Sequence, residues 1–406
     1  MPDFSFVVVA VIAFTAPVLR ELIPKLFVPA IVLELVGGII VGPQVLDIAH
    51  SSQPVELFST IGLAALLFLA GREIDVNRLR GEVLERGLAC FALGFMIAAA
   101  IAAPLHEVGL IKTPLLVAVI LVATSLSVII VPLRDAGEVN TAFGQQVIAT
   151  AAIAEFSSVI LISFFYSNER AGPGTEILHL SAFALLAIVV FVSVSRAGRN
   201  KRLSAALERL RESSAQIQTR ADLALVAIVV GIASQLGLES ILAAFTVGVI
   251  RGMTEERDED AEQKREAVAL GIFVPFFFVS SGLDFQLDQL FATIGGVIRL
   301  PVFVLALLAV HVVPALIYRR TMGARMAIAA GLLQATSFSF VIVATQIGLQ
   351  LHIMVQATAT ALVGAGLISV VAFPAIAFAM LGEQRQKGQL SLGEEVDFAT
   401  EGTGYR

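Results

Sequence analysis

The sequence predicts an all-α polytopic membrane protein with about thirteen transmembrane helices. Of its 406 residues, 57% are hydrophobic and only 15% are charged, and the mean hydropathy is +0.89, well above what a soluble globular protein shows. Apolar stretches of nearly spanning length recur along the chain, and Lys and Arg fall in alternate connections between them. Together these observations favour a bundle of helices that crosses a bilayer repeatedly.

The remaining composition narrows the class of protein. The single cysteine, Cys90, lies inside an apolar stretch, which argues against a disulfide framework and against a cysteine metal site. The amino-terminal Met1-Pro2-Asp3 lacks the positive region of a signal peptide, so the first apolar stretch is expected to be a membrane helix. We expect no cofactor, no nucleic acid partner and no enzymatic activity.

The helices are predicted from length alone. A bilayer core about 30 Å thick requires about 20 apolar residues per helix. Applied along the chain, this requirement predicts helices at 4–19, 26–43, 56–71, 87–105, 114–133, 144–166, 178–195, 222–237, 239–252, 267–283, 294–318, 325–348 and 354–381. The shortest, 239–252, is compatible with a tilted or partly re-entrant helix.

The basic residues predict the orientation. With the amino terminus outside, the connections that lie inside hold all of the 27 Lys and Arg except Lys112, Arg170 and Arg299. By the positive-inside rule, this alternation places the amino terminus outside the plasma membrane and the carboxyl terminus in the cytoplasm.

Three cytoplasmic segments have expectations of their own. The longest connection, Arg196–Arg220, is expected to lie on anionic lipid as a basic amphipathic helix. The charged connection Thr254–Glu266 is expected to be a solvated linker, with pH sensing as the alternative. Residues 382–406 are expected to form a short disordered tail, so that a regulatory nucleotide-binding domain, if one exists, belongs to a separate subunit.

An internal repeat appears as three matches at nearly one spacing. Val122–Val131 matches Gln334–Val343 at an offset of 212, Leu67–Gly71 matches Phe278–Gly282 at 211, and the pair Gly38 and Gly42 matches Gly248 and Gly252 at 210. The offset moves seven predicted helices along the chain, and because seven is odd the two halves face opposite ways. The transmembrane domain, residues 1–381, is therefore predicted to contain two inverted repeats, at about 4–166 and 222–381, with a linker helix at 178–195.

The first match also predicts broken helices. Its shared Ala-Thr-Ser-x-Ser core contributes Thr124 and Ser125 in one half and Thr336 and Ser337 in the other. Small hydroxyl residues tolerate an interruption where water or an ion satisfies the freed carbonyls. Two such breaks in opposed repeats would cross at the membrane centre, where helix ends stabilise ions of both signs. The alternative is that these residues only permit close helix packing.

Two ionisable residues stand out inside predicted helices. Glu155 is the lone carboxylate of the apolar stretch Gln145–Tyr166, where a charged side chain costs roughly 2.5–3.5 kcal/mol on insertion. We interpret it as functional, and the alternative is a structural carboxylate in a wet crevice or beside a buried base. His311, in the stretch at 294–318, is a candidate for tuning the response to pH, or for a structural hydrogen bond.

Five motifs carry a family resemblance: Leu35–Pro43, Phe68–Asp75, Ala123–Ser125, Ala244–Gly248 and Pro275–Gly282. They resemble the monovalent cation:proton antiporter superfamily, in the branch that includes sodium/proton exchangers and potassium-efflux antiporters, over nearly the whole chain to about Leu381. The resemblance implies a homodimer in which a core bundle moves against interface helices.

The same resemblance marks where this chain differs from the family pattern. It implies an Asp-Asp or Asn-Asp pair on the sixth helix, where this chain has Ala154-Glu155, and a Lys on the eleventh, where it has His311. An Arg-Gly-Glu stretch common in the twelfth helix is replaced by Ala335-Thr336-Ser337.

These observations favour secondary active antiport of a monovalent cation, Na⁺ or K⁺, against protons by alternating access. Glu155 would be the carboxylate that proton and cation share, because one carboxylate with neutral oxygens suits a monovalent cation better than a divalent one. The neutral oxygens would come from Thr124, Ser125, Thr336 and Ser337. Two alternatives stay open: a sodium-coupled symporter of organic anions, and a potassium efflux pathway gated by a partner subunit.

Overall fold

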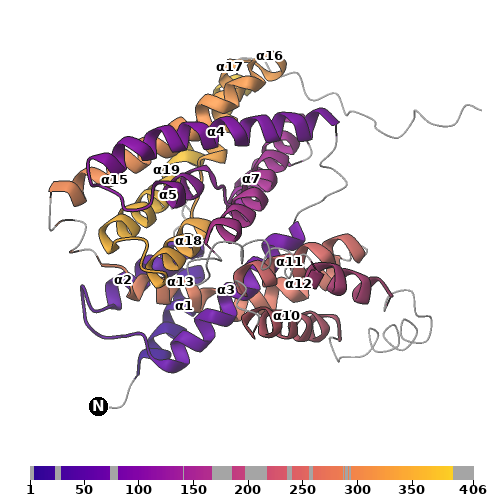
Figure 1. Ribbon diagram of the computed structural model, residues 1–406, viewed down its shortest axis with the longest axis vertical. Helices are drawn as coiled ribbons and strands as arrows, with labels where there is room; N and C mark the ends of the chain where they lie inside the picture. The colour runs from indigo at the N-terminus through magenta and orange to yellow at the C-terminus, as the bar shows by residue number, and fades with distance from the viewer. Residues whose placement is uncertain are drawn as a thin grey trace, which may run out of the picture.

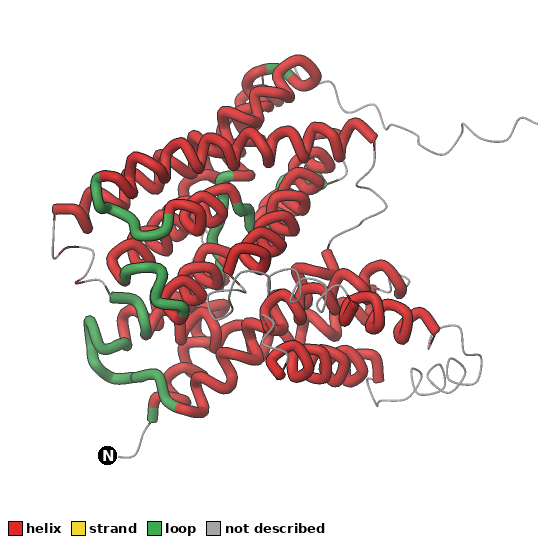
Figure 2. The backbone as a smooth tube through the Cα atoms, viewed as in Figure 1, coloured by secondary structure: helices red, strands yellow, loops and turns green. Residues whose placement is uncertain are grey.

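The protein is described by a computed structural model that covers residues 4–22, 29–73, 81–139, 141–166, 185–196, 217–235, 240–255, 259–286, 288, 291 and 294–386. Helices and short loops make up this part of the chain, and no strand occurs in it (Figure 2). The predicted all-helical class is confirmed. Most of the predicted tail, residues 387–406, and most of the predicted basic loop, residues 197–216, lie outside the described residues, whereas residues 382–386 of the predicted tail are helical.

The helices follow the predicted apolar stretches in order. Their bounds are α1 (Ser5–Leu22), α2 (Ala30–Val41), α3 (Gln53–Glu73), α4 (Gly81–Glu107), α5 (Pro114–Val122), α6 (Leu126–Asp135), α7 (Ala142–Tyr166), α10 (Ile217–Gln235), α11 (Ser240–Thr254), α12 (Glu259–Val268), α13 (Val274–Leu283), α15 (Ile294–Ala315), α16 (Arg319–Met322), α17 (Ala324–Gln334), α18 (Ser339–Gln350) and α19 (Gln356–Gln386). A π-helical turn, Ala269–Phe273, joins α12 to α13, and a 3₁₀ turn, Leu316–Tyr318, follows α15. A further apolar helix spans Leu185–Arg196 within the predicted linker.

Length and hydropathy identify the helices that can cross a bilayer. Among the described residues, eight helices or continuous helical runs are long and apolar enough to do so alone, and α17 with α18 forms a bent pair that does so together. Helices α2, α11 and Leu185–Arg196 are apolar but shorter. The count of thirteen spans stays a prediction.

The helices form two bundles (Figure 1). Helices α1–α3 and α10–α13 pack on one another in the lower part of Figure 1, and we call them the scaffold bundle. Helices α4–α7 and α15–α19 pack on one another in the upper part, and we call them the site bundle. The bundles meet at a stacked ring pair, Phe278 on Phe338, and at a hydrogen bond of 3.2 Å from Gln346 to the Ser281 hydroxyl.

Glycines let the scaffold helices approach one another very closely. A Cβ at Gly38 of α2 would overlap the backbone of Val279 in α13, and a Cβ at Gly282 would overlap the backbone of α2. In the same way, a Cβ at Gly71 of α3 would overlap α11, and one at Gly248 of α11 would overlap α3. Small residues that admit a neighbouring backbone are typical of helix contacts in membranes.

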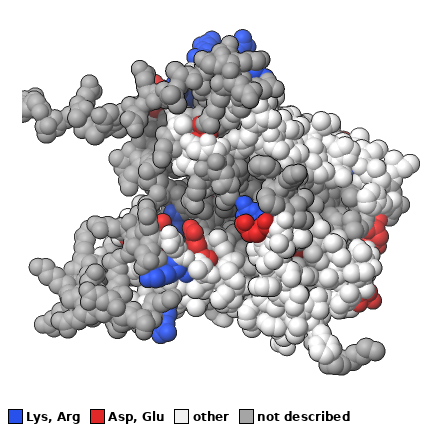
Figure 3. All heavy atoms as spheres, turned by 180° about the vertical axis from the view of Figure 1, so that it is seen from behind, with Lys and Arg blue, Asp and Glu red and all other residues white. Residues whose placement is uncertain are grey.

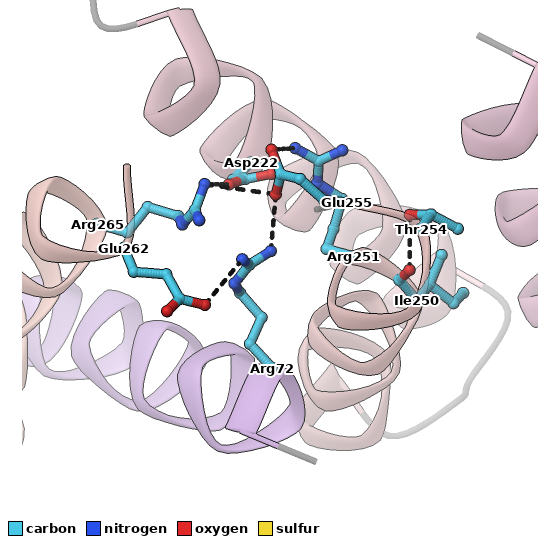
Figure 4. Close-up of polar contacts among 8 residues, drawn as sticks. All are labelled: Arg72, Asp222, Ile250, Arg251, Thr254, Glu255, Glu262 and Arg265. Carbon is cyan, nitrogen blue, oxygen red and sulfur yellow. Dashed lines mark hydrogen bonds and ion pairs between the residues drawn. The ribbon is translucent and has the colours of Figure 1, made fainter. Parts of the chain in front are cut away.

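The expected solvated linker at Thr254–Glu266 is wrong. This segment enters α12 at Glu259, and Arg265 is only 3% exposed. Three of its charged residues, Glu255, Glu262 and Arg265, belong to a charge cluster of six residues that is shown in Figure 4 and also includes Arg72, Asp222 and Arg251. The sequence shows only a charged connection, whereas the fold supplies Arg72 from α3 and Asp222 from α10 as partners.

The outer surface is suited to lipid. In the view of Figure 3 most of the described surface is uncharged, and charged side chains gather in a few patches. Large apolar side chains are exposed on it, among them Phe14 at 71%, Leu185 at 62% and Ile294 at 81%. An apolar surface of this kind marks a multi-pass membrane protein.

Candidate functional site

Two interrupted helices form the centre of the site bundle. Helix α5 ends at Val122 and α6 begins at Leu126, so that Ala123, Thr124 and Ser125 are non-helical. Helix α17 ends at Gln334 and α18 begins at Ser339, with an angle of 43° between them. The predicted breaks at both Ala-Thr-Ser segments are confirmed.

The two breaks touch and satisfy one another's backbone groups. The Ser125 N–H donates to the Thr336 carbonyl over 3.2 Å, and the Ser125 hydroxyl accepts the Phe338 N–H over 3.1 Å. The Thr124 hydroxyl donates to the Gln334 carbonyl over 2.9 Å. Non-helical backbone at membrane depth requires such partners, because no lipid atom can supply them.

Glu155 lies beside this crossing. It projects from α7, is 6% exposed, and accepts a hydrogen bond of 3.1 Å from the backbone N–H of Leu126. Leu126 is the first residue of α6, so the carboxylate faces the free N–H groups and the positive dipole end of that half-helix. The helix end offsets part of the cost of burying a negative charge here.

His311 contacts the break from α15. Its Nε2 lies 3.2 Å from the Thr124 hydroxyl oxygen and its Nδ1 lies 3.0 Å from the Leu307 carbonyl. The carbonyl only accepts, so Nδ1 carries a proton. Thr124 has one hydroxyl proton and can give it either to Gln334 or to His311, which couples the hydrogen bonding of the break to the imidazole.

The structure brings some of the predicted site residues into contact and leaves others apart. Thr124, Ser125 and the Thr336 carbonyl meet directly at the crossing. The Thr336 hydroxyl donates back to the Leu332 carbonyl of α17, at 3.4 Å. The Ser337 hydroxyl is buried and has no hydrogen-bond partner among the described residues, while the Ser337 N–H donates to Ser369 over 3.2 Å.

Two further buried residues were missed from the sequence. Gln334 borders the second break, is 3% exposed, and occupies the position that Val122 holds in the first half. A polar residue at a position that is apolar in the other repeat could have identified Gln334 from the sequence. Glu34 of α2 is 4% exposed, and its Oε2 has no hydrogen-bond partner among the described residues. It is a carboxylate inside a predicted span, which is the signal that identified Glu155.

Comparisons with known proteins agree with this architecture. The putative Na(+)/H(+) antiporter YjbQ of Bacillus subtilis is 28% identical over 400 residues, which cover 94% of this chain and 64% of YjbQ. The Na(+)/H(+)-K(+) antiporter GerN of Bacillus cereus is 28% identical over 319 residues, which cover 77% of this chain and 78% of GerN.

A solved structure shows the same fold. The sodium proton antiporter MjNhaP1 of Methanocaldococcus jannaschii aligns with a TM-score of 0.58 at 16% identity, over 97% of this chain and 99% of the other. A family model described as the transmembrane part of sodium/hydrogen exchangers matches residues 10–381. Because this match takes in most of the sequence, the chain belongs to the sodium/hydrogen exchanger family.

Proposed function

We propose that the protein exchanges a monovalent cation, Na⁺ or K⁺, for protons by alternating access, with Glu155 as the carboxylate that both ions share. The observation that carries this proposal is the position of Glu155, buried beside two crossed helix breaks and hydrogen-bonded to the first N–H of α6. A carboxylate held there can release its proton and bind a cation in its place. The relatives named above are described as sodium/proton and sodium/proton–potassium antiporters, which supports the same activity here.

The cation would find neutral oxygens at the crossing. The Thr124 and Ser125 hydroxyls and the Thr336 carbonyl already meet there. The Ser337 hydroxyl, which is buried and has no hydrogen-bond partner in the described part of the chain, can turn toward an ion. Oxygen ligands of this kind suit hard cations, and a single carboxylate neutralises one positive charge.

We further propose that the two halves are inverted repeats that form this site between them. Support comes from reciprocal contacts. Gly38 meets Gly282, and Gly248, the repeat equivalent of Gly38, meets the helix of Gly71, the repeat equivalent of Gly282. Such reciprocity is characteristic of units related by a two-fold axis. Repeats of opposite topology are a common plan of secondary transporters.

The expected stoichiometry is one cation for one proton. Ala154 stands where the family pattern has a second polar or acidic residue, so Glu155 alone would trade a proton for a cation. Such an exchange moves no net charge and gains nothing from the membrane potential. If His311 released a proton as the cation bound, two protons would move and the potential would drive transport.

The setting that we propose is a homodimer in the plasma membrane, with the amino terminus outside and the carboxyl terminus in the cytoplasm. The charge cluster supports the predicted sidedness, since it joins the ends of α3, α11 and α10 that the basic residues assign to one side. A separate regulatory subunit is compatible with this arrangement.

The decisive experiment reconstitutes the purified chain in liposomes without any partner protein. Saturable proton flux that depends on Na⁺, K⁺ or Li⁺ is expected. Flux only with an organic anion would favour the sodium-coupled symporter, and flux only with an added subunit would favour the gated potassium pathway. Among the described contacts of the breaks there is no Lys or Arg. A symporter of organic anions would need such a basic side chain to bind the anion. Clamping the membrane potential while Na⁺ is the test cation then measures the stoichiometry.

A further inference from the structure

A small cavity lies in the site bundle, next to the crossed breaks. It has a volume of about 10 Å³ and is bordered by side chains of α4, α5, α7, α15 and α17. A void of about this size begins to admit a single water molecule. Its lining includes Ala154, which adjoins Glu155 in the chain, and His311.

Polar groups converge on this cavity. Thr124, Thr150, His311 and Gln334 line it, and each is at least nine-tenths buried. The Gln334 Nε2 has no hydrogen-bond partner among the described residues. A buried amide donor without an acceptor is destabilising, and a buried water typically makes about three hydrogen bonds to such groups. The lining therefore points to water as the molecule that completes these bonds.

The cavity also touches a second hydrogen-bonded group. The Thr150 hydroxyl oxygen lies 2.7 Å from the Tyr318 hydroxyl and accepts a hydrogen bond of 3.2 Å from Gln146. Tyr318 is fully buried at the end of the α15 span, immediately before Arg319 and Arg320 of α16. Polar side chains thus continue from the breaks, past the cavity, to the buried hydroxyl of Tyr318, a residue that directly precedes the basic end of the site bundle in the chain.

We propose that this cavity binds one water molecule, which links Gln334 and the break to the Thr150–Tyr318 pair. We assign the water, with the hydroxyls of Thr124, Thr150 and Tyr318, as a path for protons between the break and the interior end of α15, and the Gln334 amide only orients the water. The water occupies the space that a larger residue than Ala154 would fill. The water site stands on geometry alone, and the path rests on the proposed exchange function.

Matched substitutions at Ala154 test the water site. Ala154→Thr and Ala154→Val fill the cavity with nearly the same volume, but only Thr brings a hydroxyl that can replace the hydrogen bonds of the water. The Val variant is expected to melt a few degrees below the Thr variant in detergent. Equal melting, or a more stable Val variant, would show that the cavity is dry and would overturn the proposal.

Substitutions at Thr150 test the path. Positioned proton-transfer groups contribute roughly 10²- to 10⁴-fold to rates, so Thr150→Val is expected to lower the turnover of proton flux in liposomes by about tenfold or more. The KM for the cation should stay unchanged, and Thr150→Ser should restore turnover. A raised KM with normal turnover would assign Thr150 to cation binding and overturn the path.

A failure of the proposed function can be told apart from a failure of the proposed water site or proton path. A wild-type chain that exchanges no cation in liposomes would refute the proposed function, whereas the melting comparison at Ala154 would still decide the water site. If exchange is normal and Thr150→Val has no effect on it, the path is refuted and the proposed function stands.

Discussion

Each bundle buries a glutamate in a membrane helix, and the two side chains differ in their surroundings. Glu155 of the site bundle accepts the first N–H of α6 and lies beside two interrupted helices. Glu34 of the scaffold bundle projects from a continuous helix, and its Oε2 has no hydrogen-bond partner among the described residues. Under the proposed exchange, burial alone would not mark the site, because an exchanged ion also needs helix ends or freed backbone groups to stabilise its charge.

The bundles also differ in how they are held together. The scaffold bundle relies on backbone contacts at glycines and on buried ion pairs. The site bundle contains the two breaks, whose backbone groups depend on single side chains such as Ser125. Helix contacts of the first kind resist deformation, whereas a break with few alternative partners can rearrange when an ion enters. Under the proposed alternating access, this difference suits a scaffold bundle that stays fixed and a site bundle that rearranges.

The largest effect in this comparison is expected when each of the two glutamates is replaced by glutamine. Glu155→Gln is expected to abolish cation-dependent proton flux in liposomes, because glutamine can neither release a proton nor neutralise a cation. Glu34→Gln is expected to leave most of the flux, and Glu155→Asp to keep part of it. Normal flux in Glu155→Gln, with an unchanged melting temperature, would remove Glu155 from the mechanism.

The charge cluster is expected to give the largest change in stability. Arg265→Met leaves Glu255 and Asp222 with fewer buried partners, and breaking a buried ion pair costs about 3–5 kcal/mol. Because Arg251 still pairs with Asp222, we expect a loss near the lower end of that range. The control is Arg86→Gln, which removes an exposed pair with Glu82 that is worth about 0–1 kcal/mol. Equal melting temperatures for the two variants would contradict a structural role of the cluster.

A smaller loss is expected at the glycine contacts. Gly248→Ala places a methyl group against the backbone of Phe68, and overpacking of this kind costs about 1–3 kcal/mol. Gly231→Ala is the matched control, since nothing lies within 4 Å of a Cβ at that position of α10. Gly38→Ala, at the repeat equivalent of Gly248, should resemble Gly248→Ala if the two halves are related by a two-fold axis. Thermal melting of the three variants measures the differences, and a tolerated Gly248→Ala would show that the helices are farther apart.

The smallest expected effect is a shift in pH dependence. His311→Gln keeps a hydrogen-bonding group near Thr124 but cannot change charge. The activity profile in liposomes is therefore expected to move along the pH axis while the maximal rate changes little. An identical profile would assign His311 to a structural hydrogen bond with the break.

The sequence by itself determined the membrane class, the order of the helices, the two breaks and the buried carboxylate Glu155. These features depend on local properties, namely the length of an apolar run, a charge within it and hydroxyl residues in a repeated motif. A helix at membrane depth must satisfy its own backbone, so local composition already limits where a break can occur.

Only the tertiary structure decided which distant side chains meet. Arg72 pairs with Glu255, 183 positions away, so a segment that looks like a solvated linker is tied to α3 by an ion pair. The Thr150–Tyr318 pair and the contact of Thr124 with His311 join residues 168 and 187 positions apart. Spacing along a helix gives the face on which a residue lies, but the residue that it faces depends on how separate helices pack. That packing turns isolated polar residues into a cluster, a crossing and a cavity.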